Sequence, residues 1–334
     1  MSTQKKKIKV IVTGAAGFIG SHLCDKLVKL GYEVHAIDNL STGRIENLKH
    51  IKKKIKFYKY DLSLKGKWST IFSNDTAYVF HLAAIADIVP SIENPDKYFN
   101  SNVISTLNIL ECCKKLKLKK LIYTASSSCY GIPKKYPTQE NDKIDPQYPY
   151  AFSKYIAEQL IVHWSKLYKI KYNSLRLFNV YGTKSRTAGT YGAMFGVFLT
   201  QKLKAKPLTI VGRGQQSRDF IYVSDVVNAL IMSAKNKSAN QIFNVGNGKP
   251  IKIIEIAKLL KSKYVFIDDR PGEPKKTHAN ISKIKKTLKW RPKITIQQGI
   301  KKLLSDIKYW NNAPLWTPKK IKIATKSWFR YLAK

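Results

Sequence analysis

No run of eighteen or more apolar residues occurs in this sequence of 334 residues, which argues against a membrane-spanning helix. The first residues, MSTQKKKIKV, also lack the apolar core of a secretory signal and lead directly into a strand-like run. We therefore expect a cytoplasmic protein with no transmembrane segment. With 44% hydrophobic residues, a chain of this length can bury a large core divided over about two domains.

Cysteine is scarce as well. The four cysteines, Cys24, Cys112, Cys113 and Cys129, lack the spacing of a metal site or of a redox motif. We interpret all four as small core residues, and we expect no metal centre.

Acidic residues and arginine are few in comparison with lysine. The chain has 21 Asp and Glu against 61 Lys and Arg, of which only eight are Arg, and its formal charge is +40. The lysines are scattered over the sequence, whereas a nucleic-acid surface favours clustered arginine and interleaved aromatic residues. We prefer a lysine-biased composition to a specific nucleic-acid partner. The positive field should still steer anionic substrates toward the protein.

The most informative stretch of the sequence covers residues 8–38. A β-branched run over residues 8–13 is typical of a buried parallel strand, and Gly14, Gly17 and Gly20 follow it. Glycines at this spacing permit a tight turn, a close approach to a pyrophosphate, and close packing of the next helix against the strand. The stretch therefore predicts a dinucleotide-binding turn.

The residues after the glycines support this interpretation. A helix is expected over residues 18–30 and ends at Gly31, and a second strand over residues 33–37 ends in Asp38. A carboxylate at this distance binds a ribose diol and repels a 2′-phosphate, so the expected cofactor is NAD. We expect the cofactor to contact the start of the helix and the polar loop after Asp38, through Phe18, Ile19, Asn39, Ser41, Thr42 and Gly43.

Strands and helices alternate through the first half of the chain. Further strands are expected over residues 55–60, 78–82, 121–125 and 172–178, and helices over residues 98–116 and 150–168, with Val103, Leu107, Leu110 and Cys113 facing inward on the first of these. This order predicts an α/β fold with a doubly wound parallel sheet. Small residues at the end of the fourth strand let a dinucleotide lie against it, at Leu82, Ala83 and Ala84. His81 has a possible catalytic role, but we prefer a packed or capping residue.

The pattern changes at about Asn179, where the units become shorter and the loops longer. We expect residues 1–178 to form a NAD-binding domain. Residues 179–334 should form mainly a smaller α/β substrate-binding domain, with a segment near 220–235 returning to the first. The C-terminal tail can be drawn as one helix with Ile323, Trp328, Phe329 and Leu332 on one side. An anionic membrane could bind such a helix, but we prefer docking on the protein itself or on a neighbouring subunit.

Three residues have the types and spacing of an oxidoreductase site. Ser126 ends the predicted fifth strand, and Tyr150 and Lys154 follow on one helix. Residues four apart share a helix face, so the ammonium of Lys154 should lie near the phenol of Tyr150 and lower its pKa toward neutrality. Tyr150 would then act as a base, while Ser126 hydrogen-bonds the same substrate oxygen and Lys154 also holds the nicotinamide ribose.

The strings TGAAGFIG, HLAA, ASSSCYG, YAFSK, LRLFNVYG, SRDFIYVSDVV, NVGNG and RPGE occur together in this order. In this combination the chain resembles the extended short-chain dehydrogenase/reductases with a Rossmann-type sheet, and among them the nucleotide-sugar epimerases of the UDP-glucose 4-epimerase type. The resemblance covers residues 8 to about 310. It implies further NAD contacts at Asp61, Leu62, Asn102 and Phe178. It implies substrate contacts at Ser126, Ser127, Ser128, Asn179, Arg186, Arg218, Arg270 and Thr277.

The resemblance also implies a reaction. Dehydratases and decarboxylases of the family carry acids directly after the catalytic Ser or Thr, whereas this chain has Ser127 and Ser128. We therefore expect a 4-epimerase that works through a transient 4-keto sugar on a UDP-linked substrate. Threonine at position 277 is small enough to admit a 2-N-acetyl group, and Arg186 falls near the arginine that binds a C6 carboxylate in UDP-glucuronate 4-epimerases. Ala86 and Asp87 depart from the UDP-galactose pattern, so the sugar stays open.

Other readings remain. A 4,6-dehydratase or decarboxylase is the alternative among enzymes, and a non-catalytic dinucleotide-binding module with a polyanion-binding surface is the alternative outside them. The resemblance also implies a homodimer, in which the helices predicted at residues 98–116 and 150–168 pair with those of a second copy as a four-helix bundle.

Overall fold

The fold is built on one seven-stranded parallel sheet. The computed structural model describes residues 7–185 and 194–332. Its central sheet has the strand order β11-β6-β5-β4-β1-β2-β3, and every neighbouring pair is parallel. The strands are β1 (Lys9–Thr13), β2 (Glu33–Asp38), β3 (Ile55–Lys59), β4 (Thr76–His81), β5 (Lys120–Ser126), β6 (Tyr172–Leu177) and β11 (Gln241–Val245). The predicted doubly wound parallel sheet is confirmed.

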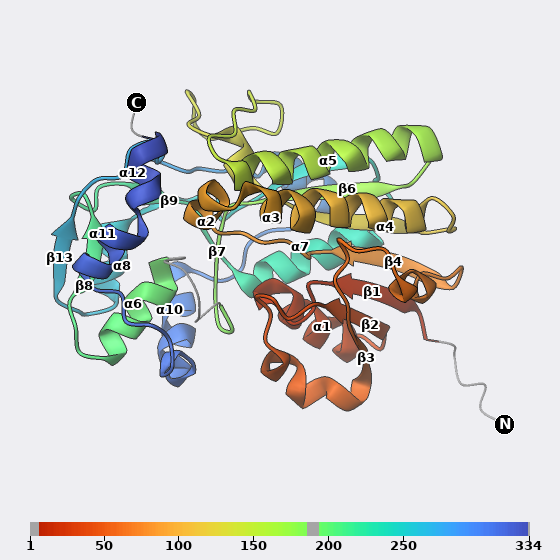
Figure 1. Cartoon of the computed structure of the whole chain (residues 1–334), viewed down its shortest axis with the longest axis horizontal. Helices are drawn as coiled ribbons and strands as arrows, with labels where there is room; N and C mark the ends of the chain where they lie inside the picture. The colour runs from red at the N-terminus through yellow and green to blue at the C-terminus, as the bar shows by residue number, and fades with distance from the viewer. Residues whose placement is uncertain (1–6, 186–193, 333–334) are drawn as a thin grey trace.

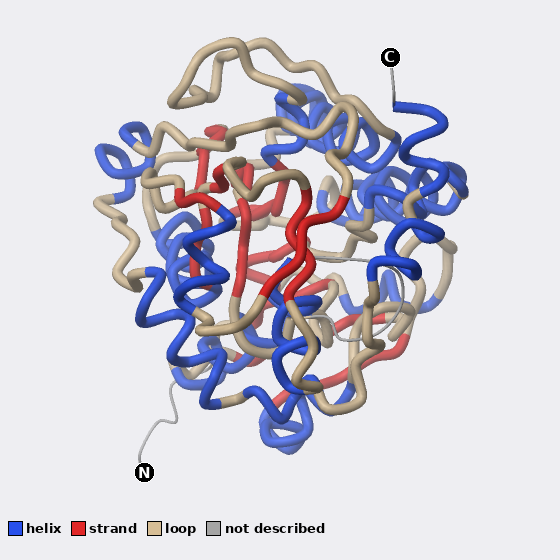
Figure 2. Tube along the Cα trace, turned by 90° about the vertical axis from the view of Figure 1, so that its left-hand side faces the viewer, coloured by secondary structure: helices blue, strands red, loops and turns tan. Residues whose placement is uncertain are grey.

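Helices cover both faces of this sheet (Figure 1). On one face, α1 (Phe18–Lys29) and α7 (Val223–Lys235) pack on alternate strand residues such as Val10 and Val12. On the other, α4 (Ser105–Cys113) and α5 (Pro149–Tyr168) pack on the residues between them, such as Ile11. Because successive strand side chains point to opposite faces, each central strand contributes to both cores, which explains its continuous apolar run. Figure 2 shows the strands enclosed between the helices.

The helix expected over residues 98–116 is interrupted. The chain forms α3 (Pro95–Phe99), a π-helical turn over Asn100–Ile104, and then α4. A π turn widens the helix and rotates the face that follows. Asn102, Thr106 and Ile109 are therefore buried, while Val103 and Leu107, both predicted to face inward, are only half-buried.

The second half of the chain adds a smaller lobe beside the sheet. Three two-stranded pairs form its frame: β7 (Asn179–Tyr181) with β10 (Phe220–Tyr222), β8 (Leu208–Val211) with β13 (Tyr264–Ile267), and β9 (Ser217–Arg218) with β12 (Ile251–Lys252). A separate hydrophobic core joins this frame to α6 (Met194–Leu203), α8 (Ile253–Leu259) and α10 (Ile296–Ser305). The part of the chain that returns to the central sheet reaches further than residues 220–235, since α7 covers the sheet and β11 joins it. Helix α9 (Ser282–Leu288) packs on β11.

The tail forms two short helices instead of the one that was drawn from the sequence. Helix α11 (Pro318–Ala324) ends at Thr325, and α12 (Lys326–Leu332) follows. The break turns Ile323 outward, where it is exposed, while Trp328 is buried. Helix α12 packs against α2 (Ile88–Glu93) of the same chain, as the preferred interpretation expected.

The structure also bears on the cysteines and on membrane-spanning helices. Three of the cysteines are buried and Cys112 is partly buried, and none forms a disulfide. Within residues 7–185 and 194–332, no helix has the length and apolarity that crossing a bilayer requires.

Candidate active site

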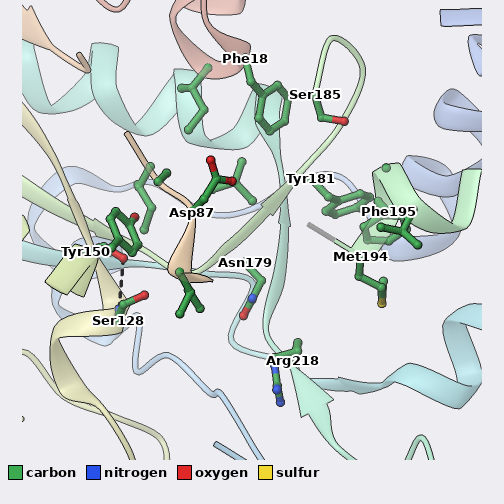
Figure 3. Close-up of a pocket in the computed structure, with 18 of the residues that line it drawn as sticks. Phe18, Asp87, Ser128, Tyr150, Asn179, Tyr181, Ser185, Met194, Phe195 and Arg218 are labelled. Atoms are coloured by element: carbon green, nitrogen blue, oxygen red, sulfur yellow. Dashed lines mark hydrogen bonds between the residues drawn. The ribbon is translucent and has the colours of Figure 1, made fainter. Parts of the chain in front are cut away.

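One cavity of about 630 Å³ lies beyond the carboxyl ends of β1, β4 and β5, between the central sheet and the smaller lobe. Ligands of open α/β sheets bind at this edge. The cavity is lined by these residues expected from the sequence: Gly14, Gly17, Phe18, Ile19, Gly20, Asp38, Thr42, Leu82, Ala84, Ser126, Ser127, Ser128, Tyr150, Lys154, Phe178, Asn179, Arg218 and Arg270. Figure 3 shows Phe18, Tyr150, Asn179 and Arg218 around it.

The glycine turn between β1 and α1 forms a cradle that side chains would fill. Gly14 has a φ of +66°, and a Cβ on it would lie 2.8 Å from the backbone nitrogen of Ala83. A Cβ on Gly20 would lie 2.0 Å from the carbonyl oxygen of Gly14. The turn thus brings the N-terminus of α1 to the cavity, where its backbone N–H groups favour a phosphate. The arrangement fits the pyrophosphate of a dinucleotide.

Asp38 stands at the end of β2, beside this cradle. Its carboxylate accepts hydrogen bonds from the backbone nitrogens of Ala16 at 2.9 Å and Leu40 at 2.8 Å. Burial raises the pKa of this carboxyl, although these backbone bonds act in the opposite direction. The carboxylate lines the cavity with acceptor capacity suited to a ribose diol, so the residues present fit NAD.

Some residues expected to contact the cofactor do not line the cavity and instead order the loop that follows β2. Asn39 donates a hydrogen bond to Asp61 at 3.1 Å and accepts one from the backbone nitrogen of Ser41 at 3.0 Å. A Cβ on Gly43 would lie 2.8 Å from the Asp38 carboxylate. These residues therefore hold the loop after β2 against the Asp38 strand end.

The other expected cofactor residues lie behind the cavity wall. Leu62 is buried in the core beneath the sheet, and the backbone nitrogen of Ala83 donates to Thr13 Oγ1 at 3.1 Å. Asn102 accepts from the backbone nitrogen of Ile85 at 2.8 Å and donates to Ser153 Oγ at 2.9 Å. Asn102 thus ties the segment after β4 to α5.

The catalytic candidates Ser126 and Tyr150 are brought together. Ser126 is the last residue of β5, and its hydroxyl accepts a hydrogen bond from the backbone nitrogen of Ser128 at 3.2 Å. Tyr150 lies in the first turn of α5 and lines the same cavity as Ser126. Burial raises the pKa of the Tyr150 phenol, and the side chain of Ser126 opposes this. The predicted lowering of the Tyr150 pKa is therefore wrong, because the effect of burial outweighs that of Ser126.

Lys154 lies one turn further along α5, as its spacing predicts. Its ammonium nitrogen is 4.2 Å from the centre of the Tyr123 ring. Burial lowers the pKa of Lys154 to about 7, and the nearby carboxylate of Glu158 acts to raise it. Lys154 can therefore carry or lose its charge near neutral pH.

His81 is packed, in agreement with the preferred interpretation. Its two ring nitrogens lie 2.8 Å from Thr13 Oγ1 and 2.9 Å from Thr106 Oγ1. Burial lowers the pKa of His81 to about 3, so the ring is neutral and orders the end of β4.

Two arginines surround one acid in the lining of the cavity. Arg218 donates to Glu273 Oε1 at 2.6 Å, and Arg270 lies 3.8 Å from the other carboxylate oxygen of Glu273. Asn179 accepts a hydrogen bond from Thr277 Oγ1 at 2.9 Å. Thr277 thus orients Asn179 and does not itself line the cavity. Arg186 lies outside the described residues.

Several lining residues were missed by the sequence analysis. Asp87 was noted only as a departure from a pattern, yet its carboxylate points into the cavity (Figure 3) and raises the pKa of Tyr150. Glu273 was matched only as part of the string RPGE. The smaller lobe and the tail also contribute an aromatic wall, which comprises Tyr181, Phe195, Trp316 and Trp328. Tyr181 was matched only as part of the string LRLFNVYG and Trp328 was placed only on one side of the tail helix, whereas Phe195 and Trp316 lie in no motif.

Comparison with known proteins gives consistent matches. The sequence pattern of the "NAD dependent epimerase/dehydratase family" matches residues 10–246. A solved UDP-glucose 4-epimerase of Thermotoga maritima with UDP-glucose is 34% identical, has a TM-score of 0.84, and covers 91% of this chain and 99% of its own.

Two further solved structures match equally well. A UDP-N-acetylglucosamine 4-epimerase of Methanobrevibacter ruminantium, in complex with UDP-N-acetylmuramic acid, is 33% identical with a TM-score of 0.84. A UDP-glucuronic acid 4-epimerase of Bacillus cereus, with UDP-glucuronic acid and NAD, is 33% identical with a TM-score of 0.83. Each covers 90% of this chain and 99% of its own.

Proposed function

Because the chain belongs to the NAD dependent epimerase/dehydratase family, with NAD as its cofactor, we propose that it is a 4-epimerase of a UDP-linked hexose. The observation that carries the proposal is that Ser126, at the end of β5, and Tyr150, in the first turn of α5, line the same cavity as the glycine turn. Three similar structures that bear the names of 4-epimerases support it. We further propose that residues 1–178 mainly bind NAD and residues 179–334 mainly bind the nucleotide sugar.

The chemistry follows from the substrate. C4 of a hexose bears no acidic proton, so it cannot be inverted by simple deprotonation. NAD, when bound, supplies the acceptor for the C4 hydride and returns the same hydride later. Tyr150 takes the O4 proton as the C4–H bond breaks, which leaves a C4=O bond, and gives the proton back in the reverse step. Ser126 donates a hydrogen bond to O4 and keeps it aligned with Tyr150.

The remaining polar residues bind and orient the substrate. Arg218 and Arg270 line the cavity with guanidinium groups, which suit a diphosphate through paired N–H donors. Asn179, held by Thr277, offers an amide beside them. A diphosphate fixed at this end leaves the flat 4-keto sugar free to turn and present its other face for hydride return.

A second candidate function is a lyase of the same family. The sequence argument against it counted only acids that directly follow Ser126. Asp87 places a carboxylate in the cavity near Tyr150, and such a group could move a proton at C5 or C6 after oxidation at C4. Elimination of water or loss of carbon dioxide would then follow.

The deciding experiment is turnover by the NAD-loaded protein. The substrate panel contains UDP-glucose, UDP-galactose, UDP-GlcNAc, UDP-GalNAc and UDP-glucuronate. Products are separated by chromatography, and their masses are determined by mass spectrometry. An epimerase yields the C4 epimer at unchanged mass, whereas a product lighter by water or carbon dioxide contradicts epimerisation and supports the lyase. Tyr150→Phe should lose activity by about 10²–10⁴-fold. Tyr155→Phe is the matched control, since Tyr155 lies on the same helix without lining the cavity.

We also propose a homodimer through α4 and α5. Apolar side chains are exposed on the π-helical turn that leads into α4, at Ile104, and on α5, at Phe152, Leu167 and Tyr168. Pairing with a second copy would bury them in a four-helix bundle. Light scattering after gel filtration should give twice the chain mass. Phe152→Glu should shift the protein to monomer, and a monomeric wild type would contradict the proposal.

A further inference from the structure

The C-terminal helix α12 joins two separate parts of the molecule beside the cavity. Ser327 Oγ donates a hydrogen bond to Glu93 Oε1 at 2.7 Å, at the end of α2. Trp328 Nε1 donates to the carbonyl oxygen of Pro271 at 2.6 Å, in the loop that carries Arg270. The helix therefore contacts both the segment after β4 and the loop after β13, and Figure 1 shows α12 above the smaller lobe beside α2.

Trp328 is the residue of this helix that reaches the cavity. Its side chain is 4% exposed and lines the same space as Tyr150 and Arg218. The guanidinium carbon of Arg270 lies 5.6 Å from the centre of its ring. Because the indole N–H is already bonded to Pro271, the ring is held in one orientation and offers its apolar surface to its neighbours.

Tyr148 connects this indole to the catalytic end of the cavity. The Tyr148 ring is stacked on Tyr150, with centroids 6.3 Å apart and planes 11° apart, and lies 6.5 Å from the Trp328 ring. Tyr148 also occupies the N-cap of α5 and makes no capping hydrogen bond. An N-cap position favours Ser, Thr, Asp or Asn, and a residue that cannot cap costs about 1 kcal/mol. Tyr148 does not line the cavity, and its ring instead packs between Tyr150 and Trp328 and links their positions.

From these contacts we propose that Trp328 is a substrate-binding residue, and that α12 completes the nucleotide-sugar site with an indole wall beside Arg270, supported from behind by Tyr148. This inference rests on the proposed function. The wall lies between Tyr150, which would take the O4 proton, and Arg270, which would bind the diphosphate. A hexose presents C–H groups on its ring faces, and a large rigid indole buries such a surface at low entropic cost. The ligand class is a hexose carried on a nucleoside diphosphate.

The test separates binding from turnover. UDP-glucose and UDP are titrated calorimetrically into the NAD-loaded protein, and kcat and KM are measured with the sugar that the panel identifies. Trp328→Ala should raise the dissociation constant and KM for the nucleotide sugar by about tenfold or more. Its kcat should stay within about twofold, its bound NAD should be unchanged, and UDP alone should lose less affinity. Trp328→Phe should recover most of the binding.

The control is Tyr331→Ala, because Tyr331 is 59% exposed on the same helix and should leave all constants unchanged. Epimerisation with the same nucleotide-sugar affinity in Trp328→Ala and wild type would overturn this inference alone. Weaker binding in Trp328→Ala without turnover by the wild type would overturn the epimerase proposal alone. Absence of UDP-glucose binding by the wild type would overturn both. If Trp328→Ala does not fold, unchanged binding in a Trp328→Leu variant, which removes the aromatic ring, overturns the inference.

Discussion

The ammonium nitrogen of Lys154 lies over the Tyr123 ring, 4.2 Å from its centre. An aromatic face stabilises a cation without neutralising it, and Tyr123 also holds the backbone of Lys154 through a hydrogen bond to its carbonyl oxygen at 3.4 Å. Lys154 is thus held in a buried position where its amine can still be protonated. Since burial lowers its pKa to about 7, the ammonium is present below pH 7 and is lost as the pH rises above it.

Replacing Lys154 should change the pH dependence of turnover. Burial raises the pKa of the Tyr150 phenol, so the phenol is protonated at neutral pH and the rate should rise with pH. An ammonium favours the phenolate, and Lys154 carries its charge only below about pH 7. Lys154→Met should therefore lower kcat by about 10²-fold below pH 7, and its difference from the wild type should shrink as the pH rises above 7. The measurement is kcat from pH 6 to 9.5. A profile that keeps its shape and only falls in height would mean that Lys154 serves binding alone.

The geometry of the glycine turn predicts different outcomes for the substitutions Gly17→Ala and Gly20→Ala. A Cβ on Gly17 would lie 3.1 Å from the carbonyl oxygen of Gly14, which needs a small adjustment, whereas one on Gly20 would lie 2.0 Å from the same atom. Gly17→Ala should therefore fold but place a methyl group where a pyrophosphate approaches, and its NAD content should fall about tenfold. Gly20→Ala should lose stability as well.

Thermal unfolding and quantitation of released NAD measure these two effects separately. Gly31→Ala is the control, because Gly31 has a φ of +80° and no neighbour within 4 Å of an added Cβ. Its cost of about 1–2 kcal/mol comes from the backbone alone and should leave NAD content unchanged. Full NAD content in Gly17→Ala would contradict the assigned cradle.

Much of the central sheet could be predicted because local patterns determine it. The apolar run before Gly14 and the spacing to Asp38 depend on near neighbours in the sequence, and so does the pair Tyr150 and Lys154 on α5. These features needed only strand and helix periodicity. By contrast, which side chains of α4 face inward depends on the π turn at residues 100–104, and helix periodicity alone does not reveal this turn.

The site was harder to predict because its walls come from distant segments. Asp87 and Trp328 are 241 positions apart in number, and only folding brings α2 against α12. The pKa of Tyr150 also depended on burial, which the spacing to Lys154 does not report. Sequence spacing therefore predicted which residues share a helix face. It could not predict how deeply each side chain is buried, and so how far burial shifts its pKa.

The buried ion pair beneath α5 should be essential for stability. Arg176 donates to both carboxylate oxygens of Glu158 from its Nε at 3.1 and 3.2 Å, and its Nη1 donates to the Tyr130 hydroxyl at 2.9 Å. Both side chains of the pair are almost fully buried. Glu158→Gln should leave the guanidinium without a counter-charge and lower the free energy of unfolding by about 3–5 kcal/mol. Urea unfolding measures this, and a loss below about 1 kcal/mol would refute the assignment. The double variant Glu158→Leu with Arg176→Met should be closer to wild type.

The buried imidazole of His81 should make stability depend on pH. Its pKa is about 3 in the folded protein and 6.5 in the unfolded chain, so between these values only the unfolded state binds the proton. The contribution of His81 to the free energy of unfolding is therefore fully present above pH 6.5 and is lost as the pH falls toward 3. From pH 7.5 to 5 the loss should be about 2 kcal/mol. His81→Gln should remove this part of the pH dependence in urea unfolding at the two pH values. Because other groups titrate in the same range, the test is the difference between wild type and variant, and parallel losses in both would show that His81 is not the source.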